Sequence, residues 1–458
     1  MRHPSSTIIS TATPPGKSAL SVIRMSGADT IAIIGKVFRS SKNIVPAAFE
    51  GFRTYHGHIY DGTIIIDEVL IHFYKAPNSY SGEDMLEISC HGNVLIVEKI
   101  LELLIRKGCS LAEPGEFTKR AFINGKIDLS QAEAVESLIN SKSERAIEES
   151  LKMIRGDLKK KICHLKDEIA NMKARIDAQI EFEDTDGIKG PRNQEIVERF
   201  KTISDSINGI LTGNCNREKL NEGQKISICG RPNVGKSSLY NLILNRSRSI
   251  VSGIPGTTRN VIDSELVFEG YLVKLYDTAG SGVDSDCLID IESAEKSSMI
   301  INESDIIICV FDISEKIKQI DKEIVEKCKG KKIIAVLNKS DLTHKIENKN
   351  IEVIADFQRI IEISCIKETG LEDLRDAIGN QLKFTDNNSV MVSARQQLAL
   401  REINDSINEI VESLEKSSNI EIISYLIDRV LESAGKLDGT TIEKDMLERI
   451  FSSFCIGK

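Results

Sequence analysis

A chain of 458 residues is too long for a single hydrophobic core, so its length predicts two or three domains. Its 41% hydrophobic and 28% charged residues are typical of a soluble globular protein, and no run approaches the ~20 apolar residues of a membrane-spanning helix. The formal net charge of −9 argues against a protein that grips nucleic acid alone, so any RNA would need a local basic patch or a partner. The first residues carry neither a secretory signal nor an Arg-rich transit helix, and a cytoplasmic location is expected.

Ten cysteines are scattered along the chain, and none of them form a C-x-x-C pair. Neither a zinc knuckle nor a disulfide framework is therefore indicated. Most of these cysteines are expected to be reduced thiols packed in cores.

The pattern along the chain predicts a multidomain α/β architecture. Residues 1–118 alternate short β-rich runs, such as 21–25 and 85–88, with turns and one helical stretch at 94–107, which is typical of a small α+β domain. Residues 119–215 become helical, because apolar side chains recur three and four positions apart.

The second half of the chain changes its pattern twice. Residues 216–382 alternate strands and helices, which indicates a doubly wound sheet of the P-loop GTPase (Ras-like) class. Helices resume over residues 383–458. The simplest architecture is a helical domain, built from both flanks, into which the α/β domain is inserted.

Residues 230–237, Gly-Arg-Pro-Asn-Val-Gly-Lys-Ser, fit the phosphate-binding pattern G-x-x-x-x-G-K-[ST]. An apolar strand at 225–229 precedes this phosphate loop, and a helix follows from Ser238. Backbone amides can converge on phosphate oxygens there, Lys236 can reach the terminal phosphates, and Ser237 offers a hydroxyl to Mg²⁺. The site is also expected to include Asn233, Val234, Gly235 and Ser238.

Three further segments follow in the order that a guanine-nucleotide site requires. The segment 277–280, Asp-Thr-Ala-Gly, begins with an acidic residue that can act on the metal and ends with a glycine whose amide can contact the γ-phosphate. In Asn-Lys-Ser-Asp at 338–341, the Asp341 carboxylate can accept two hydrogen bonds from guanine, which adenine does not offer. Residues 364–366 are expected to cap the base. The predicted nucleotide contacts are Asp277, Thr278, Ala279, Gly280, Asn338, Lys339, Asp341, Ser364, Cys365 and Ile366.

The segment 256–259, Gly-Thr-Thr-Arg, lies where a switch loop is expected, and we assign Thr258 to the Mg²⁺ shell. Hydrolysis also needs charge neutralisation between the phosphates and an oriented water. Ser281 follows the Asp-Thr-Ala-Gly segment, so the water-orienting glutamine of Ras-like enzymes is missing. Arg259 could neutralise charge, or Asn233 could hold a monovalent cation; alternatively Asn233 only shapes the loop.

Other motifs lie at 12–16 (Ala-Thr-Pro-Pro-Gly), 77–84 (Pro-Asn-Ser-Tyr-Ser-Gly-Glu-Asp), 114–117, 129–134 and 454–458 (Phe-Cys-Ile-Gly-Lys). Through them the chain resembles the MnmE (TrmE) family of tRNA-modification GTPases over its whole length from residue 7. The resemblance implies a tetrahydrofolate-binding N-terminal domain, a helical domain, an inserted G domain and a homodimer. It also implies that the protein works with the flavoprotein MnmG on tRNA, adding a carboxymethylaminomethyl or aminomethyl group to carbon 5 of the wobble uridine.

The same resemblance implies a set of ligands. GTP hydrolysis would use Mg²⁺ on Ser237 and Thr258 and would be stimulated by K⁺. Potassium would be held by Asn233 together with the segment Ser252, Gly253, Ile254, Pro255, Gly256 and Thr257, of which Ser252, Ile254 and Thr257 are the ligands. The one-carbon donor would be 5,10-methylenetetrahydrofolate, with 5-formyltetrahydrofolate as an analogue, and its ligands would be Arg24, Glu87, Lys126 and Lys458.

The chain departs from the family after Gly280, where Ser-Gly-Val replaces the usual Leu-Arg-Glu. The family's water-orienting glutamate aligns with Asp290, and Glu292 is the neighbouring alternative. Nucleotide binding should survive this change, while turnover is in doubt. Cys455 corresponds to the family's candidate thiol in the modification chemistry, although a structural role is at least as compatible with the sequence.

Two other functions stay open. A ribosome-assembly GTPase of the Era or EngA type would share the phosphate loop, but the KH domain or second G domain that it requires has no counterpart in the sequence pattern. A regulatory GTPase that binds nucleotide and scarcely hydrolyses it is compatible with the altered segment after Gly280.

Overall fold

The computed structural model of the protein describes residues 6–181, 191–212, 217–246, 248–249, 263–277, 298–346, 351–382, 391–416, 419–455 and 457. The chain divides into two compact units. The first comprises Met1–Glu136, Met153–Ile203 and Ala399–Lys458, and the second comprises Ser137–Lys152 and Ser204–Leu398. Within the described part of the chain, no helix is both long enough and apolar enough to cross a membrane. The boundaries expected at residues 118, 215 and 382 stay predictions.

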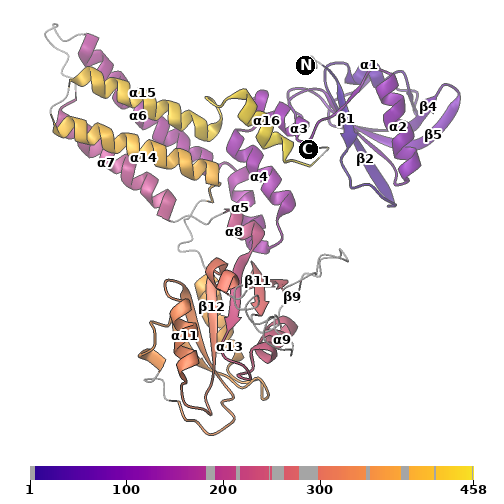
Figure 1. The fold of residues 1–458 in the computed structure, drawn as a ribbon. Helices are drawn as coiled ribbons and strands as arrows, with labels where there is room; N and C mark the ends of the chain where they lie inside the picture. Colours follow the sequence, from indigo (N-terminus) through magenta and orange to yellow (C-terminus); the bar gives the residue numbers. More distant parts are fainter. Residues whose placement is uncertain are drawn as a thin grey trace. The chain divides into compact units, whose positions relative to one another are not determined.

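The first unit opens with a seven-stranded sheet in the order β3-β4-β5-β6-β2-β1-β7 (Figure 1). Its strands are β1 (Ile8–Thr11), β2 (Leu20–Ser26), β3 (Phe38–Ser40), β4 (Arg53–Asp61), β5 (Ile64–Tyr74), β6 (Met85–His91) and β7 (Ser110–Leu111). All neighbouring strands are antiparallel except β1 and β7. The strands predicted at 21–25 and 85–88 are confirmed.

Helix α2 (Val94–Arg106) packs against this sheet and confirms the predicted helical stretch. It begins after Asn93, whose side chain accepts a hydrogen bond from the Leu95 amide at 2.9 Å and so satisfies a free helix-end donor. Its apolar stripe, with Leu103 and Leu104, joins one core cluster with the inward side chains of the sheet. Shorter elements between the strands are α1 (Thr30–Ile34) and the 3₁₀ turn η1 (Pro46–Ala48).

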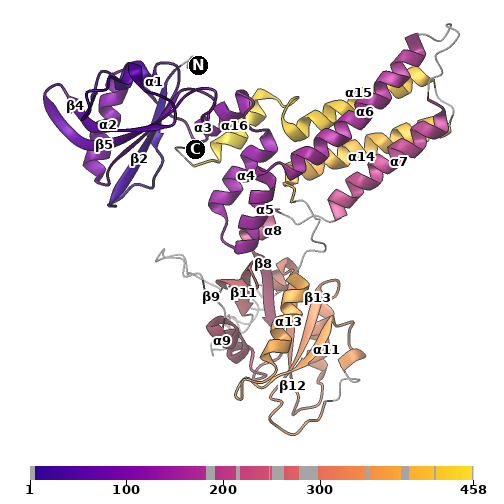
Figure 2. The same cartoon turned by 180° about the vertical axis from the view of Figure 1, so that it is seen from behind.

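The rest of the first unit is helical. Its helices, some of which continue into the second unit, are α3 (Glu116–Ile123), α4 (Leu129–Asn140), α6 (Asp157–Glu181), α7 (Asn193–Thr212), α14 (Ala394–Glu415), α15 (Ile420–Asp438) and α16 (Lys444–Ser452). Figures 1 and 2 show α6, α7, α14 and α15 side by side as a bundle. Helix α6 buries Ile162, Leu165 and Ile169 along one stripe, which confirms the helical pattern predicted there.

The second unit holds a seven-stranded sheet in the order β14-β13-β12-β8-β11-β10-β9. Its strands are β8 (Gln224–Cys229), β9 (Arg248–Ser249), β10 (Asp263–Phe268), β11 (Tyr271–Asp277), β12 (Ile306–Asp312), β13 (Lys332–Asn338) and β14 (Arg359–Glu362). From β14 to β11 the neighbours are parallel, whereas β10 and β9 are antiparallel. Every residue of β12 is buried, as expected for a central strand covered on both faces. The predicted doubly wound α/β fold is confirmed.

The helices described in the second unit are α5 (Glu144–Ile154), whose last two residues belong to the first unit, α8 (Arg217–Glu222), α9 (Lys236–Arg246), α11 (Gln319–Lys327) and α13 (Leu371–Leu382). The stretch that precedes and begins α5 is attached to the β10–β11 hairpin: the Arg145 amide donates to the Gly270 carbonyl at 3.1 Å, and Lys142 Nζ lies 2.9 Å from Glu265 Oε2. Sequence patterning did not predict that residues 137–152 would group with the second sheet.

The C-terminal helix α16 packs against the start of the helical region in the first unit. Phe451 and Phe454 are buried in one cluster with Leu129. Gly115, which precedes α3, approaches this cluster so closely that an added Cβ would lie 2.6 Å from the Phe451 carbonyl oxygen and 3.0 Å from Phe454 Cβ. The backbone of Gly115 is also left-handed, with φ +67°. Position 115 therefore admits only glycine without a shift of α16.

We expect Gly115→Ala to destabilise the first unit more than Gly125→Ala. Gly125 is a matched control because it has the same φ of +67° but nothing within 4 Å of an added Cβ. Both variants incur left-handed strain of about 1 kcal/mol, and only Gly115→Ala adds an overpacking cost of about 1–3 kcal/mol. Thermal unfolding and the rate of tryptic release of α16 measure the difference. Equal losses in the two variants would contradict a tight contact at residue 115.

Candidate functional site

The phosphate loop joins the end of β8 to the start of α9, two residues earlier than the helix start expected at Ser238. Gly230, Asn233 and Gly235 all have positive φ angles, of +148°, +66° and +97°. An added Cβ would lie 2.4 Å from the Val310 carbonyl oxygen at Gly230 and 2.2 Å from Asn338 Nδ2 at Gly235. The two glycines of the motif are therefore required by close packing as well as by backbone conformation.

Lys236 is 7% exposed and lies over the phosphate loop. Its ammonium donates hydrogen bonds to the carbonyl oxygens of Gly230 and Arg231, at 2.8 and 2.9 Å. Burial lowers the pKa of Lys236, and the nearby Asp277 carboxylate opposes this shift. The loop thus holds a partly desolvated cation at the place where the sequence predicts phosphate oxygens.

The two groups predicted to act on Mg²⁺ meet in the structure. Ser237, in the first turn of α9, donates from Oγ to Asp277 Oδ2 at 2.8 Å. Asp277 is the last residue of β11, which runs parallel to β8, and it is 4% exposed. A hydroxyl beside a carboxylate supplies the hard oxygen donors that Mg²⁺ prefers, so these residues fit the ion.

Asn338, at the end of β13, connects the phosphate loop to the segment predicted to read the base. Its Nδ2 donates to the Val234 carbonyl at 2.8 Å. Its Oδ1 accepts from the amides of Lys339 and Cys365, at 2.8 and 3.3 Å. One buried amide side chain therefore holds three segments of the predicted site in register.

Asp341 is fixed by Ser364, whose Oγ donates to Asp341 Oδ1 at 2.5 Å. This hydrogen bond lowers the pKa of Asp341, so the carboxylate is ionised at neutral pH and available as an acceptor. Ser364 is itself buried, while the side chain of Ile366 is 84% exposed. The arrangement suits recognition of two N–H donors on one edge of a base.

The structure thus connects predicted nucleotide residues through the strand ends of one sheet. Those in the described part of the chain are Asn233, Val234, Gly235, Lys236, Ser237, Ser238, Asp277, Asn338, Lys339, Asp341, Ser364, Cys365 and Ile366. The other predicted ligands lie outside the described residues and stay predictions: Ser252, Gly253, Ile254, Pro255, Gly256, Thr257, Thr258, Thr278, Ala279, Gly280, Asp290, Glu292 and Lys458.

Sequence patterning missed two ionic anchors of this site. Lys339 Nζ lies 2.6 Å from Asp312 Oδ2, and although burial opposes it, hydrogen bonds from Lys339 and Ser314 lower the pKa of Asp312. In the same turn after β12, Glu315 places a carboxylate oxygen 3.0 Å from Arg231 of the phosphate loop. The sequence does mark Asp312, because an acidic residue at the end of an otherwise apolar strand indicates a functional position.

The predicted folate ligands in the described residues fall into two places. Arg24 and Glu87 are cross-strand partners on β2 and β6, with Arg24 Nη2 2.7 Å from Glu87 Oε1. Arg24 also donates to the Gly457 carbonyl at 3.1 Å, so the end of the chain reaches this pair. Lys126 is exposed and donates to the Pro77 carbonyl at 3.0 Å.

Cys455 precedes this chain end and is exposed. Its carbonyl accepts from the Gly115 amide at 3.5 Å, so the backbone at Cys455 is attached to the first unit while the residue stays exposed. An accessible thiol is compatible with the chemical role predicted for it.

Comparison with known proteins gives full-length relatives. The family model described as the GTP-binding protein TrmE N-terminus matches residues 7–126, and the one described as the MnmE helical domain matches residues 129–455. The tRNA modification GTPase MnmE of Thermotoga petrophila is 37% identical over 99% of this chain and 100% of its own length. The proteins of the same name from Thermoanaerobacter pseudethanolicus and Clostridioides difficile are 37% and 38% identical, each over 99% of both chains.

We expect Asp341→Asn to weaken GDP binding on the order of a thousandfold, because the amide loses the charge, keeps one acceptor oxygen and turns an N–H donor toward the second guanine donor. The variant should gain affinity for XDP, since the new amide can donate to the carbonyl at xanthine C2. Isothermal calorimetry with both nucleotides measures the exchange. Ser340→Ala is the control, because it alters the adjacent side chain and leaves the carboxylate in place. Unchanged GDP affinity in Asp341→Asn would remove this residue from base recognition.

Proposed function

Because the chain belongs to the MnmE family of tRNA modification GTPases, we propose that it hydrolyses GTP to support modification of carbon 5 of the wobble uridine in tRNA. The observation that carries the proposal is the amide side chain of Asn338, which joins the phosphate loop to the segment that presents Asp341. A site built this way suits a nucleotide with a guanine base and a polyphosphate. The modification would add a carboxymethylaminomethyl or aminomethyl group.

At the nucleotide, each described residue has a distinct proposed role. The ammonium of Lys236 donates hydrogen bonds to two loop carbonyls. Oxygens of the β- or γ-phosphate of a bound nucleotide would replace these two acceptors. Ser237 and Asp277 would hold Mg²⁺, which when bound neutralises charge on the phosphates. Asp341 would orient the base, with Ser364 keeping its carboxylate in place.

Three elements of hydrolysis are proposed from the family resemblance and, for Asn233 and Thr258, from their positions in the sequence. A potassium ion on Asn233 and the segment 252–257 would supply the positive charge that an arginine finger gives in other GTPases. Asp290, or its neighbour Glu292, would orient the attacking water, and Thr258 would complete the Mg²⁺ shell. The left-handed backbone of Asn233 and its exposed side chain support the first role, because they leave the amide oxygen accessible to solvent ions.

The first unit is proposed to bind tetrahydrofolate as the one-carbon donor. The Arg24–Glu87 pair supports this: its carboxylate suits the donor edge of a pterin, and its guanidinium, 2.7 Å away, holds that carboxylate in place. Lys126 and Lys458 are proposed as further ligands. A homodimer, the flavoprotein MnmG as a partner, and a cytoplasmic location complete the proposal.

Replacing Asn233 by glycine separates the cation role from loop shaping. Glycine adopts the φ of +66° without strain but removes the amide oxygen, so GDP affinity should stay within about twofold of the parent value. Stimulation of GTP turnover by KCl over NaCl should disappear. Asn233→Ala removes the same oxygen and also strains the loop, so the difference between the two variants shows the effect of the strain. Retained KCl stimulation in Asn233→Gly would mean that Asn233 only shapes the loop, and near-zero turnover of the parent would favour a regulatory GTPase.

Deletion of the gene should remove the carbon-5 modification of wobble uridines from bulk tRNA. Complementation with the parent gene or with Ser340→Ala should restore it, whereas Lys236→Ala, which lacks the phosphate-binding ammonium, should not. Mass spectrometry of tRNA nucleosides is the measurement. Unchanged wobble uridines in the deletion strain would refute the tRNA role, and co-purification with ribosomal subunits would favour the ribosome-assembly alternative.

A further inference from the structure

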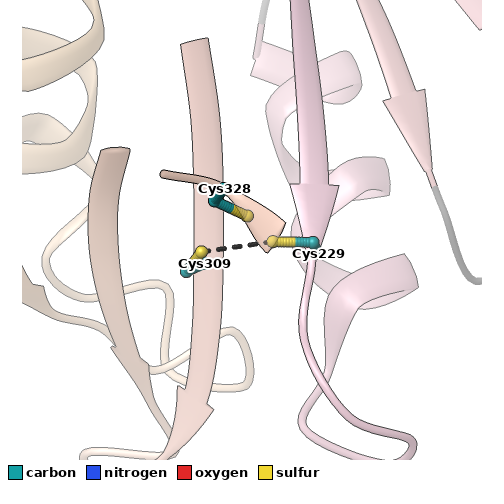
Figure 3. Close-up of side chains that lie close together, drawn as sticks. All are labelled: Cys229, Cys309 and Cys328. Atoms are coloured by element: carbon teal, nitrogen blue, oxygen red, sulfur yellow. Dashed lines mark hydrogen bonds between the residues drawn. The ribbon is translucent and has the colours of Figure 1, made fainter. Parts of the chain in front are cut away.

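Three cysteine side chains converge inside the second unit, next to the phosphate loop. The sulfur atoms of Cys229, Cys309 and Cys328 all lie within 4.8 Å of one another, and the first two are 3.2 Å apart (Figure 3). We call these residues the thiol triad. None of the three is more than 2% exposed.

The fold brings the triad together from distant parts of the chain. Cys229 and Cys309 are register partners on the parallel strands β8 and β12, so their side chains leave the sheet on the same face. Cys328 caps the C-terminal end of α11, and all three belong to the core cluster that packs around β12 and β13. A thiol from a helix end thus closes over a pair of thiols from the sheet.

Core packing alone is a weak explanation for this arrangement. A buried cysteine behaves as a small apolar side chain and can be replaced by alanine or valine in most cores. Packing does not require the polar ends of three such side chains to share one point. Eight cysteines belong to the described part of the chain, and the triad is the group among its His, Cys, Asp and Glu residues whose donor atoms meet as metal ligands do.

We propose that the thiol triad binds one soft, thiophilic cation of the copper(I) class in three-coordinate geometry. Sulfur donors select soft ions over Mg²⁺ or Ca²⁺. Zn²⁺ takes four ligands in structural sites, and no fourth His, Cys, Asp or Glu joins the group among the described residues. Metal–sulfur bonds of about 2.3 Å in a plane place the sulfurs about 4 Å apart, so the triad needs only small movements to hold such an ion.

The charges around the triad are compatible with a cation. Hydrogen bonding with Cys229 and burial raise the pKa of Cys309, so its thiol stays protonated while the site is empty. Cys328 Sγ donates to the Ile324 carbonyl at 3.2 Å, so this thiol too carries a proton that a bound ion must displace. Binding displaces protons to solvent; the single positive charge of the ion offsets one of the thiolates that this leaves, and the ammonium of Lys236 interacts favourably with the thiolate of Cys229.

The position of the triad predicts coupling to nucleotide binding. Cys229 directly precedes Gly230, whose carbonyl accepts a hydrogen bond from Lys236. Trigonal coordination must separate the sulfur atoms of Cys229 and Cys309 from 3.2 Å to about 4 Å, and Gly230 lies beside this pair, since an added Cβ there would be 2.4 Å from the Val310 carbonyl oxygen. We therefore expect a bound cation to weaken GDP affinity, and GDP to weaken cation affinity by the same factor.

Anaerobic titration of the reduced, full-length protein with Cu(I) against the chelator bicinchoninate tests the proposal. The parent protein should take up one equivalent that the chelator does not remove, with three sulfur ligands in its X-ray absorption spectrum. Cys309→Ser and Cys328→Ser should each bind this equivalent at least tenfold more weakly. Cys163→Ser, on the exposed side of α6, and Cys90→Ser, a buried cysteine of the first sheet, are matched controls that should bind like the parent.

Thermal unfolding and GDP binding without copper report whether each variant folds. Cys328→Val replaces Cys328→Ser if the serine does not fold, since it keeps an apolar side chain at the end of α11. Uptake that is unchanged in folded variants of residue 328, or a spectrum with nitrogen or oxygen ligands, would overturn the proposal. A several-fold loss of GDP affinity on copper loading, absent in Cys328→Val, would support the coupling. These outcomes are independent of tRNA modification, because they measure binding alone.

Discussion

The second unit depends on one buried contact, the hydrogen bond from Asn338 to the carbonyl of Val234. It joins the end of β13 to the phosphate loop across the intervening strand β12. The phosphate-binding half and the base-reading half of the site are therefore held in place relative to each other. The same amide excludes any side chain at residue 235, because its nitrogen occupies the space that a Cβ would need. Gly235 is therefore required by its contact with Asn338 of β13 as well as by its place in the phosphate loop. Without this contact, the segment that holds Asp341 and the segment that holds Lys236 would no longer be connected to each other.

Parallel strands explain why these groups meet at all. The carboxyl ends of β8, β11, β12 and β13 lie along one edge of the sheet, and each ends in a residue that the site uses or that adjoins it. Asp277 reaches Ser237 from one side of β8, and Asp312 reaches Lys339 from the other. Asp277 and Asp312 are buried, but each has a hydrogen-bonding or charged partner that a bound ligand could replace.

The sequence predicted the parts of this site that local spacing controls. The phosphate loop, its strand and helix, and the base-reading segment around Asp341 are encoded in short runs whose residue types have a direct chemical reason. Arg231–Glu315 was not predictable, because the partners are far apart in sequence and each looks like an ordinary surface charge. Asp312 was marked only by its place at the end of an apolar strand, and nothing in the sequence paired it with Lys339. The thiol triad was missed for the same reason: no C-x-x-C spacing marks it, and only the register of β8 with β12 brings Cys229 to Cys309. The attachment of residues 137–152 to the β10–β11 hairpin likewise leaves no periodic signal.

In the first unit the chain end shows how a motif can be recognised before its role is understood. The motif at 454–458 is recognisable from its residue types, and the role expected from it was a chemical one for the thiol of Cys455. The structure instead uses its backbone: the Cys455 carbonyl accepts from Gly115, and the Gly457 carbonyl accepts from Arg24. Gly457 can make this approach because an added Cβ would lie 2.1 Å from the Thr11 carbonyl oxygen. Backbone contacts therefore fix the tail on the Arg24–Glu87 pair and leave the thiol exposed. A reaction at Cys455 would then require a substrate that enters from solvent, since the protein itself does not enclose the sulfur.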